Sequence, residues 1–150
     1  MQTEIHPEQR HRFNEACESM TSQLRSHVPS ERIQRADTHG KKRYIAGPFI
    51  DGNLALQLIL SFDLTTYEIN TMIRSVDGDF MTQDAILVVM MNFVTGSCRI
   101  MHKNGPGPND LIRTITRGFD FSESTFPQGA EMRPDLWRNL VAVMLTAFGH

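Results

Sequence analysis

Glu8, His11 and Glu15 have the residue types and the spacing of a metal site on a helix. Steps of three and four residues place the three side chains on one helical face, and a Glu-x-x-His pair can bind a metal ion inside a helical bundle. The opposite face carries the apolar residues Phe13 and Met20, so the carboxylates and the imidazole should point to solvent. No second Glu-x-x-His pair follows. The sequence therefore favours a solvated helix face, and we predict no metal site.

Cys17, Cys98 and Ser97 are the candidate nucleophiles, and the histidines could serve as their bases. The order Gly96-Ser97-Cys98 lacks the second glycine of a Gly-x-Ser-x-Gly nucleophile elbow. Cys17 falls on the apolar face of a predicted helix, where a cysteine usually packs. We therefore predict no catalytic residue and no cofactor, and the sequence leans away from an enzyme.

Residues 29–43 include the basic region of the chain. Between residues 25 and 43 six cations face two carboxylates, a local charge of +4 in a chain whose formal charge is -2. A Walker A phosphate loop needs a glycine where Arg35 stands and a serine or threonine where Lys42 stands. A cationic segment beside a tyrosine can instead contact a nucleic-acid backbone or an anionic membrane surface, although it can also be a solvated linker. We expect polyanion binding by Arg32, Arg35, Lys41, Lys42, Arg43 and Tyr44.

The periodicity of apolar residues predicts the elements that position these groups. Residues 7–28 should form an amphipathic helix, because apolar side chains recur at steps of three and four, and Pro7 suits its first turn. Residues 29–43 lose this period, which predicts a loop or flexible connector before a strand near 43–47. Leucine or phenylalanine then occupies every second position from 54 to 64, which predicts a strand over residues 53–64 with one face in the core.

Residues 65–76 change to helical spacing. Thr65 and Glu68 have the spacing of a capping box, and the apolar residues around them recur as on one face of a helix. We predict a short helix that ends near Asp77 and Gly78.

Residues 85–94 are almost continuously apolar, so they could form a buried strand or a buried helix capped at Thr82. We favour the strand. The order Thr95-Gly96-Ser97 suits a tight turn, and residues 97–102 suit a returning strand.

The C-terminal part begins with a glycine- and proline-rich loop at 105–110, followed by an expected short helix to Phe119 and irregular chain over 121–132. From Pro134 a helix follows that has little polar face. Such a helix must be buried, either in its own core or against another subunit. We expect homo-oligomerisation through Leu136, Trp137, Leu140, Val141, Met144 and Phe148.

A length of 150 residues is one domain's worth, residues 1–150, with the helix 7–28 and the connector 29–43 preceding a core over 44–150. The predicted fold class is α+β, a small antiparallel sheet flanked by the N-terminal amphipathic helix and the C-terminal apolar helix. The predicted strands lie near 43–47, 53–64, 85–94 and 97–102.

The composition, 40% hydrophobic and 21% charged, is ordinary for a globular protein. The two cysteines form no CxxC pair, which favours a reducing compartment. The polar N-terminus lacks the apolar core of a signal peptide, and the longest apolar run, 85–91, is too short to span a bilayer. We expect an intracellular protein that is soluble or peripherally associated with a membrane.

These patterns favour a non-enzymatic structural or accessory protein that associates with itself, as a small viral or mobile-element protein would, and whose basic arm contacts a polyanion. The alternative is a small enzyme or ligand-binding domain. Its pocket would form between the loops 47–52 and 105–110, with His39, His102 and Asp110 as the polar lining. A deep pocket that unites the two loops would favour this alternative.

Overall fold

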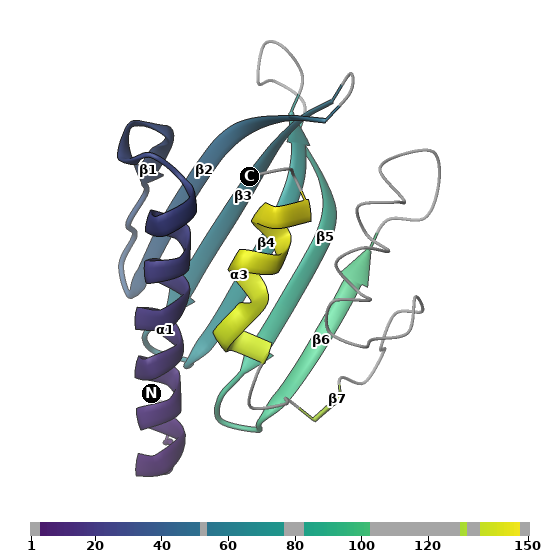
Figure 1. Cartoon of the computed structure of the whole chain (residues 1–150). Coiled ribbons are helices and arrows are strands. Elements are labelled where there is room, and N and C mark those ends of the chain that lie inside the picture. The colour runs from purple at the N-terminus through teal and green to yellow at the C-terminus, as the bar shows by residue number, and fades with distance from the viewer. Residues whose placement is uncertain (1–3, 52–53, 77–82, 103–129, 132–135, 148–150) are drawn as a thin grey trace.

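The computed structural model describes residues 4–51, 54–76, 83–102, 130–131 and 136–147. Within these residues seven strands form one antiparallel sheet, and their order in the sheet is their order in the sequence. Two α-helices lie on one face of this sheet and contact each other (Figure 1), so the predicted α+β class is confirmed. In chain order the elements are α1 (Pro7–His27), the 3-10 helix η1 (Ser30–Arg32), β1 (Ile33–Arg35), β2 (Lys41–Asp51), β3 (Leu54–Asp63), β4 (Glu68–Val76), β5 (Gln83–Asn92), β6 (Ser97–His102), β7 (Ala130–Glu131) and α3 (Leu136–Ala147).

Helix α1 forms where the sequence predicted it. His6 caps its first turn, because its Nδ1 accepts a hydrogen bond from the backbone N–H of Glu8 at 3.2 Å. Pro7 occupies the first turn, where a helix has no use for the missing N–H. The buried residues recur at steps of three and four, and this face packs into the core with the sheet and α3. They are Phe13, Ala16, Met20 and Leu24.

The core lies between the two helices and the sheet. On β3 every second residue from Leu56 to Phe62 is at most 2% exposed, as the strict alternation predicted. Helix α3 adds its apolar side chains to the same cluster. The nearly all-apolar C-terminal helix is therefore buried within its own chain. Its buried residues are Trp137, Leu140, Val141, Met144 and Leu145.

Residues 68–76 form strand β4, so the helix predicted over 65–76 is wrong. The spacing that suggested a helix has a structural origin. Met72 is apolar although it faces away from the core, while Thr71, which is 0% exposed, is polar although it faces the core. These two residues interrupt the alternation that a strand with one buried face usually shows.

The segment expected to be a loop or flexible connector, residues 29–43, carries regular structure. Strand β1 pairs with β2, with Arg35 opposite Tyr44, and β2 already begins at Lys41. Gly40 has a φ of 75°, a left-handed conformation that glycine adopts without strain, and it supplies the tight turn between the two strands. The expectation of a loop is therefore wrong at β1 and from Lys41 onward.

Strands β5 and β6 form the predicted hairpin, paired from Leu87 opposite His102 to Asn92 opposite Ser97. The strand prediction for residues 85–94 is confirmed, and the helical alternative is excluded. The loop predicted at 105–110 and the short helix to Phe119 lie outside the described residues. So does the irregular chain predicted over 121–132, apart from β7.

Candidate functional site

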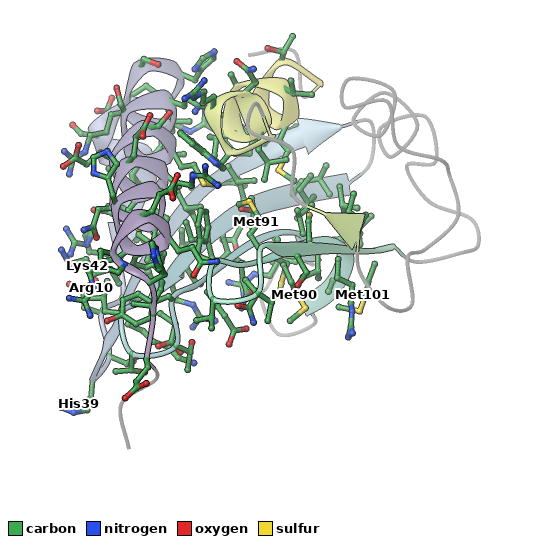
Figure 2. All side chains as sticks on the ribbon, turned by 90° about the horizontal axis from the view of Figure 1, so that it is seen from below. Arg10, His39, Lys42, Met90, Met91 and Met101 are labelled. Atoms are coloured by element: carbon green, nitrogen blue, oxygen red, sulfur yellow. The ribbon has the colours of Figure 1, made fainter. Side chains whose placement is uncertain are left out.

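Within the described part of the chain, one face of the sheet carries no helix. Both α-helices lie on the other face, and Figure 2 shows Met91 pointing toward them while Met90 and Met101 point away. Successive side chains of a strand point to opposite sides, so every second residue contributes to this uncovered side. We call it the open face. It comprises Lys41, Arg43 and Ile45 of β2 and the residues of β3 to β6 on the same side of the sheet. These include the residues paired in line with the three β2 residues and also Gln57 and Ala55 of β3 and Arg74 and Val76 of β4.

An apolar row crosses the open face from β2 to β6. The register of the sheet places five apolar side chains in line, one from each strand. Because neighbouring strands lie about 4.8 Å apart, the row is about 19 Å long. Ile59, in the middle of the sheet, is only 2% exposed, whereas Met101, at the β6 end, is 39% exposed. The row consists of Ile45, Ile59, Met72, Val88 and Met101.

Three arginines border the apolar row on both sides. Arg43 and Arg99 lie in the neighbouring line on one side, at its β2 and β6 ends, and Arg74 of β4 lies on the other side. Among the described residues none of the three forms an ion pair with a carboxylate. Nε of Arg74 donates to Oε1 of Gln57 at 2.8 Å. Burial lowers the pKa of Arg74, and the charge of Arg43 lowers it further, so among the described residues the two arginines reinforce a positive charge along this border.

A polar hollow of about 400 Å³ lies on the open face beside the row. Its lining joins the cations Lys41 and Arg43 to the carboxylates Asp63 and Glu68. Asn70 also lines the hollow, and its buried side-chain Oδ1 has no hydrogen-bond partner among the described residues. A buried acceptor without a partner is costly, so a donor from a bound molecule would be stabilised here.

A second hollow, of about 590 Å³, lies between α1 and the first residues of β2. We call it the α1–β2 groove. Cys17 and Arg25 come from α1, and Lys42 and Tyr44 come from β2. Burial raises the pKa of the Cys17 thiol to about 12, although the charge of Lys42 acts in the opposite direction. The thiol is therefore protonated at neutral pH and is a poor nucleophile.

The structure separates the residues that the sequence predicted as a polyanion site. Strand alternation sends Lys41 and Arg43 to the open face and Lys42 to the α1–β2 groove. Tyr44 is only 6% exposed, and the guanidinium of Arg35 lies 4.6 Å from the centre of its ring. No base or lipid can therefore stack on this tyrosine without displacing Arg35.

The remaining two arginines of that predicted site have partners within the chain. Arg35 forms an ion pair with Asp37 at 2.5 Å. The guanidinium of Arg32 lies over the ring of Phe49, 5.3 Å from its centre, and donates to the carbonyl of Pro48. The residues thus do not form one basic arm, and polyanion binding stays a prediction.

Four residues of the predicted oligomer interface belong to the core of the chain itself. Trp137, Leu140, Val141 and Met144 are each at most 4% exposed, so they offer almost no surface to a second copy. Burial in its own core is the alternative that the sequence left open for this helix. Phe148 and the side chain of Leu136 lie outside the description. Self-association stays a prediction, and it would need other residues.

The stripe of Glu8, His11 and Glu15 faces solvent, as predicted. The His11 side chain is 80% exposed and lies 3.9 Å from Glu15, while Glu8 pairs with Arg12 at 3.1 Å. Glu15 also lies 3.6 Å from Arg138 of α3. Among the residues that the structure describes, no three His, Cys, Asp or Glu side chains come close enough together to bind a metal ion.

The other candidate nucleophiles are Cys98 and Ser97 in β6. Cys98 is 3% exposed, and burial raises the pKa of its thiol to about 12. The Ser97 hydroxyl hydrogen-bonds to the hydroxyl of Thr95 at 2.7 Å in the turn that precedes β6. Neither group has the neighbouring base that would activate it, within the described residues.

The alternative pocket lies largely outside the described residues, because these omit residues 105–110 and the side chain of His102. Residues 47–51 belong to β2. His39 is exposed and lies at the end of the hairpin between β1 and β2, remote from Met101 in Figure 2. The alternative therefore stays a prediction.

Comparison with known proteins assigns no family to this chain. No family model matches it, and no curated protein and no solved structure matches it either. No helix in the described ranges is both long and apolar enough to cross a membrane. The geometry of the open face and of the two hollows therefore has to indicate the function.

Sequence reasoning missed the open face. Its signal was present in β5, where Val88 and Met90 continue the apolar run on the side away from the helices. A strand that is apolar on both sides is usually covered on both sides. Here the helices of the described residues cover one side, and the sequence alone did not show how many helices there would be on each side.

Proposed function

We propose that the protein is a non-enzymatic association module that binds a partner protein on the open face of its sheet. The observation that supports this proposal is the apolar row from Ile45 to Met101 with its polar border, which no helix of the described residues covers. Contiguous apolar surface with a polar rim is typical of sites where proteins bind other proteins.

The side chains of the open face suit such a contact. Met72, Met90 and Met101 are unbranched and polarisable, so they can adapt to the shape of an apolar partner. Asn70 offers a buried acceptor beside them, in the polar hollow. A partner with apolar groups and a few hydrogen-bond donors would therefore gain both burial and specificity on this face.

The test compares three purified, tagged proteins as baits in an extract of the source cells. Val88→Lys places a charge in the apolar row, and His11→Lys places one on the exposed face of α1 as a matched control. We expect a protein that the wild type and His11→Lys capture but Val88→Lys does not, and that binds again when purified. Equal capture by all three baits would contradict the proposal, provided that circular dichroism shows them equally folded.

A second candidate function is binding of a polyanion at the α1–β2 groove. It is favoured by Arg25 and Lys42, which line this groove and form no ion pair among the described residues. Retention on heparin separates the two faces. The double variant Arg25→Ala/Lys42→Ala should elute at lower salt than Lys41→Ala/Arg43→Ala, because only the first pair lies in the groove. Equal retention of both double variants and the wild type would remove this candidate.

A further inference from the structure

The chemistry of the partner can be inferred from the charges around the apolar row. We propose that the segment that binds the open face is an acidic, amphipathic protein segment, with apolar side chains over the row and carboxylates on both of its flanks. This inference rests on the proposed function and adds to it the chemical class of the partner.

The positions of the three arginines carry the inference. Arg43 and Arg99 lie on one side of the row at β2 and β6, and Arg74 lies on the other side at β4. An occupant that follows the row therefore meets a cation on each flank. Arg43 and Arg99 are four strands apart, about 19 Å, which a helix of about 13 residues spans.

Two of the arginines repel each other and have no acidic partner among the described residues. Arg43 and Arg74 act on each other as like charges across the line of Ile59, and Arg74 is partly buried. No carboxylate of the described residues pairs with either of them. Guanidinium groups bind carboxylates through two parallel hydrogen bonds, so a carboxylate near both would offset their repulsion.

A nucleic acid fits this face less well than an acidic protein segment. The described aromatic side chains, including Tyr44, Phe62 and Phe93, are buried or packed against the core, so the open face offers no ring on which a base could stack. The row itself is apolar, and the line beyond Arg43 carries the carboxylates Asp63 and Glu68. Phosphates extending past the arginines would meet Glu68 and Asp63, and the nearby Lys41 is already paired with Asp63 at 3.8 Å.

A second copy of the chain also fits less well. Two copies could pack face to face about a two-fold axis that runs parallel to the strands and passes through Met72. Arg43 of one copy would then lie opposite Arg99 of the other. If the axis ran along the apolar row instead, Asp63 and Glu68 of one copy would lie opposite Ala55 and Val76 of the other. The first arrangement opposes like charges and the second buries carboxylates against apolar residues, and both are unfavourable.

The experiment uses the full chain and two designed helical peptides of about 14 residues, long enough for about four turns. Both peptides carry the same apolar residues, and the flanking positions are glutamate in one and lysine in the other. Fluorescence anisotropy at physiological salt measures their affinities. We expect the glutamate peptide to bind at least about tenfold more tightly, because opposite charges attract it and like charges repel the other.

Variants then locate the contact. Arg43→Gln, Arg74→Gln and Arg99→Gln should each weaken binding of the glutamate peptide by about threefold or more, whereas Arg12→Gln on α1 should not change it. Arg74→Glu should reduce the preference between the two peptides. Circular dichroism checks that the variants are folded.

The outcomes separate this inference from the proposed function. Equal binding of both peptides that Val88→Lys abolishes would overturn the acidic partner and leave the open face as the binding surface. Failure of the glutamate peptide to bind at about 100 µM, a weak protein–peptide affinity, would overturn the acidic partner as well. Binding that is insensitive to Val88→Lys and to the three arginine variants would overturn both proposals. Tighter arginine-dependent binding of a single-stranded oligonucleotide, of anionic vesicles or of a second copy of the chain would replace the acidic segment by that occupant.

Discussion

At the scale of single residues, Asp63 connects β3 to β4 through its carboxylate. Oδ1 accepts hydrogen bonds from the backbone N–H of Thr65 at 3.0 Å, from the Thr65 hydroxyl at 2.7 Å and from the backbone N–H of Thr66 at 3.1 Å. We expect Asp63→Ala to lower the free energy of unfolding by about 1–3 kcal/mol, because these donors lose a charged acceptor. Chemical denaturation at pH 7 measures the change, with the exposed Glu18→Ala as the control.

The same carboxylate predicts a dependence on pH. Burial raises the pKa of Asp63, but the hydrogen bonds from Thr65 and Thr66 outweigh burial and leave it below the ordinary value of 3.8. A lowered pKa in the folded state means that the stabilisation is complete above 3.8 and is lost as the pH falls through the folded-state pKa. The difference between the wild type and Asp63→Ala should therefore shrink below pH 3.8. If the difference in unfolding free energy between the two proteins stayed constant down to about pH 2, the Asp63 carboxylate would not be its cause.

The two buried thiols should make the stability of the folded chain decrease at high pH. Burial raises the pKa of Cys17 and of Cys98 from 9.0 to about 12. Their contribution to stability is present below pH 9 and is lost as the pH rises toward 12, because only the unfolded thiols ionise in this window. Urea titrations from about pH 8.5 to about pH 10.5 measure this loss. We expect the double variant Cys17→Ala/Cys98→Ala to lose less stability over this range than the wild type. Parallel losses would show that the thiols do not contribute.

At the scale of elements, Gln23 joins the two helices. Its side-chain Nε2 donates to the carbonyl of Arg138 at 2.7 Å, and its Oε1 accepts from the N–H of Ala142 at 3.0 Å. Arg138 and Ala142 are four residues apart, so the amide of Gln23 contacts a carbonyl and an N–H that pair with each other in a regular α-helix. The position of α3 on the sheet therefore depends in part on α1.

We expect Gln23→Ala to lower the free energy of unfolding by about 1–3 kcal/mol, because it leaves backbone groups of α3 without their partner. Ser22→Ala, on the exposed side of the same turn, should change it by less than about 0.5 kcal/mol. Denaturant titrations followed by circular dichroism measure both. A loss at Gln23 no larger than that at Ser22 would show that α3 closes its own hydrogen bonds when the amide is removed.

An element could be predicted from the sequence where one of its faces is apolar and the other is polar. Strand β3 was predicted because leucine and phenylalanine face the core at every second position, from Leu56 to Phe62. Strand β4 was missed because Met72 and Val76 are apolar on the open face, which mimics helical spacing. Strand β1 was missed because its three residues, Ile33–Arg35, are too few to show a period.

The open face could not be predicted from the sequence because it depends on pairing. Ile45 and Met101 are distant in the sequence and become ends of one row only through the register of five strands. The clustered methionines were noticeable in the sequence, but their direction was not. The cations Lys41, Lys42 and Arg43 are adjacent in the sequence but do not form one surface, because neighbouring residues in a strand point to opposite faces.

At the scale of the whole molecule, the two faces of the sheet differ in what covers them. Helices α1 and α3 bury one face (Figure 2), while the open face keeps an apolar row and three arginines without an acidic partner among the described residues. This asymmetry favours a molecule that uses its sheet as a platform for a partner. It also explains why a C-terminal helix with little polar face is compatible with a single folded chain.

The most direct measurement places a photo-crosslinking amino acid at Met101 on the open face and, in a second protein, at His11 on the exposed face of α1. Illumination in an extract of the source cells captures what lies against each position. We expect one crosslinked protein from position 101 that is absent from position 11, with a mass different from that of a second copy of this chain. The same crosslinked proteins from both positions, or none from position 101, would contradict the open face as the binding surface.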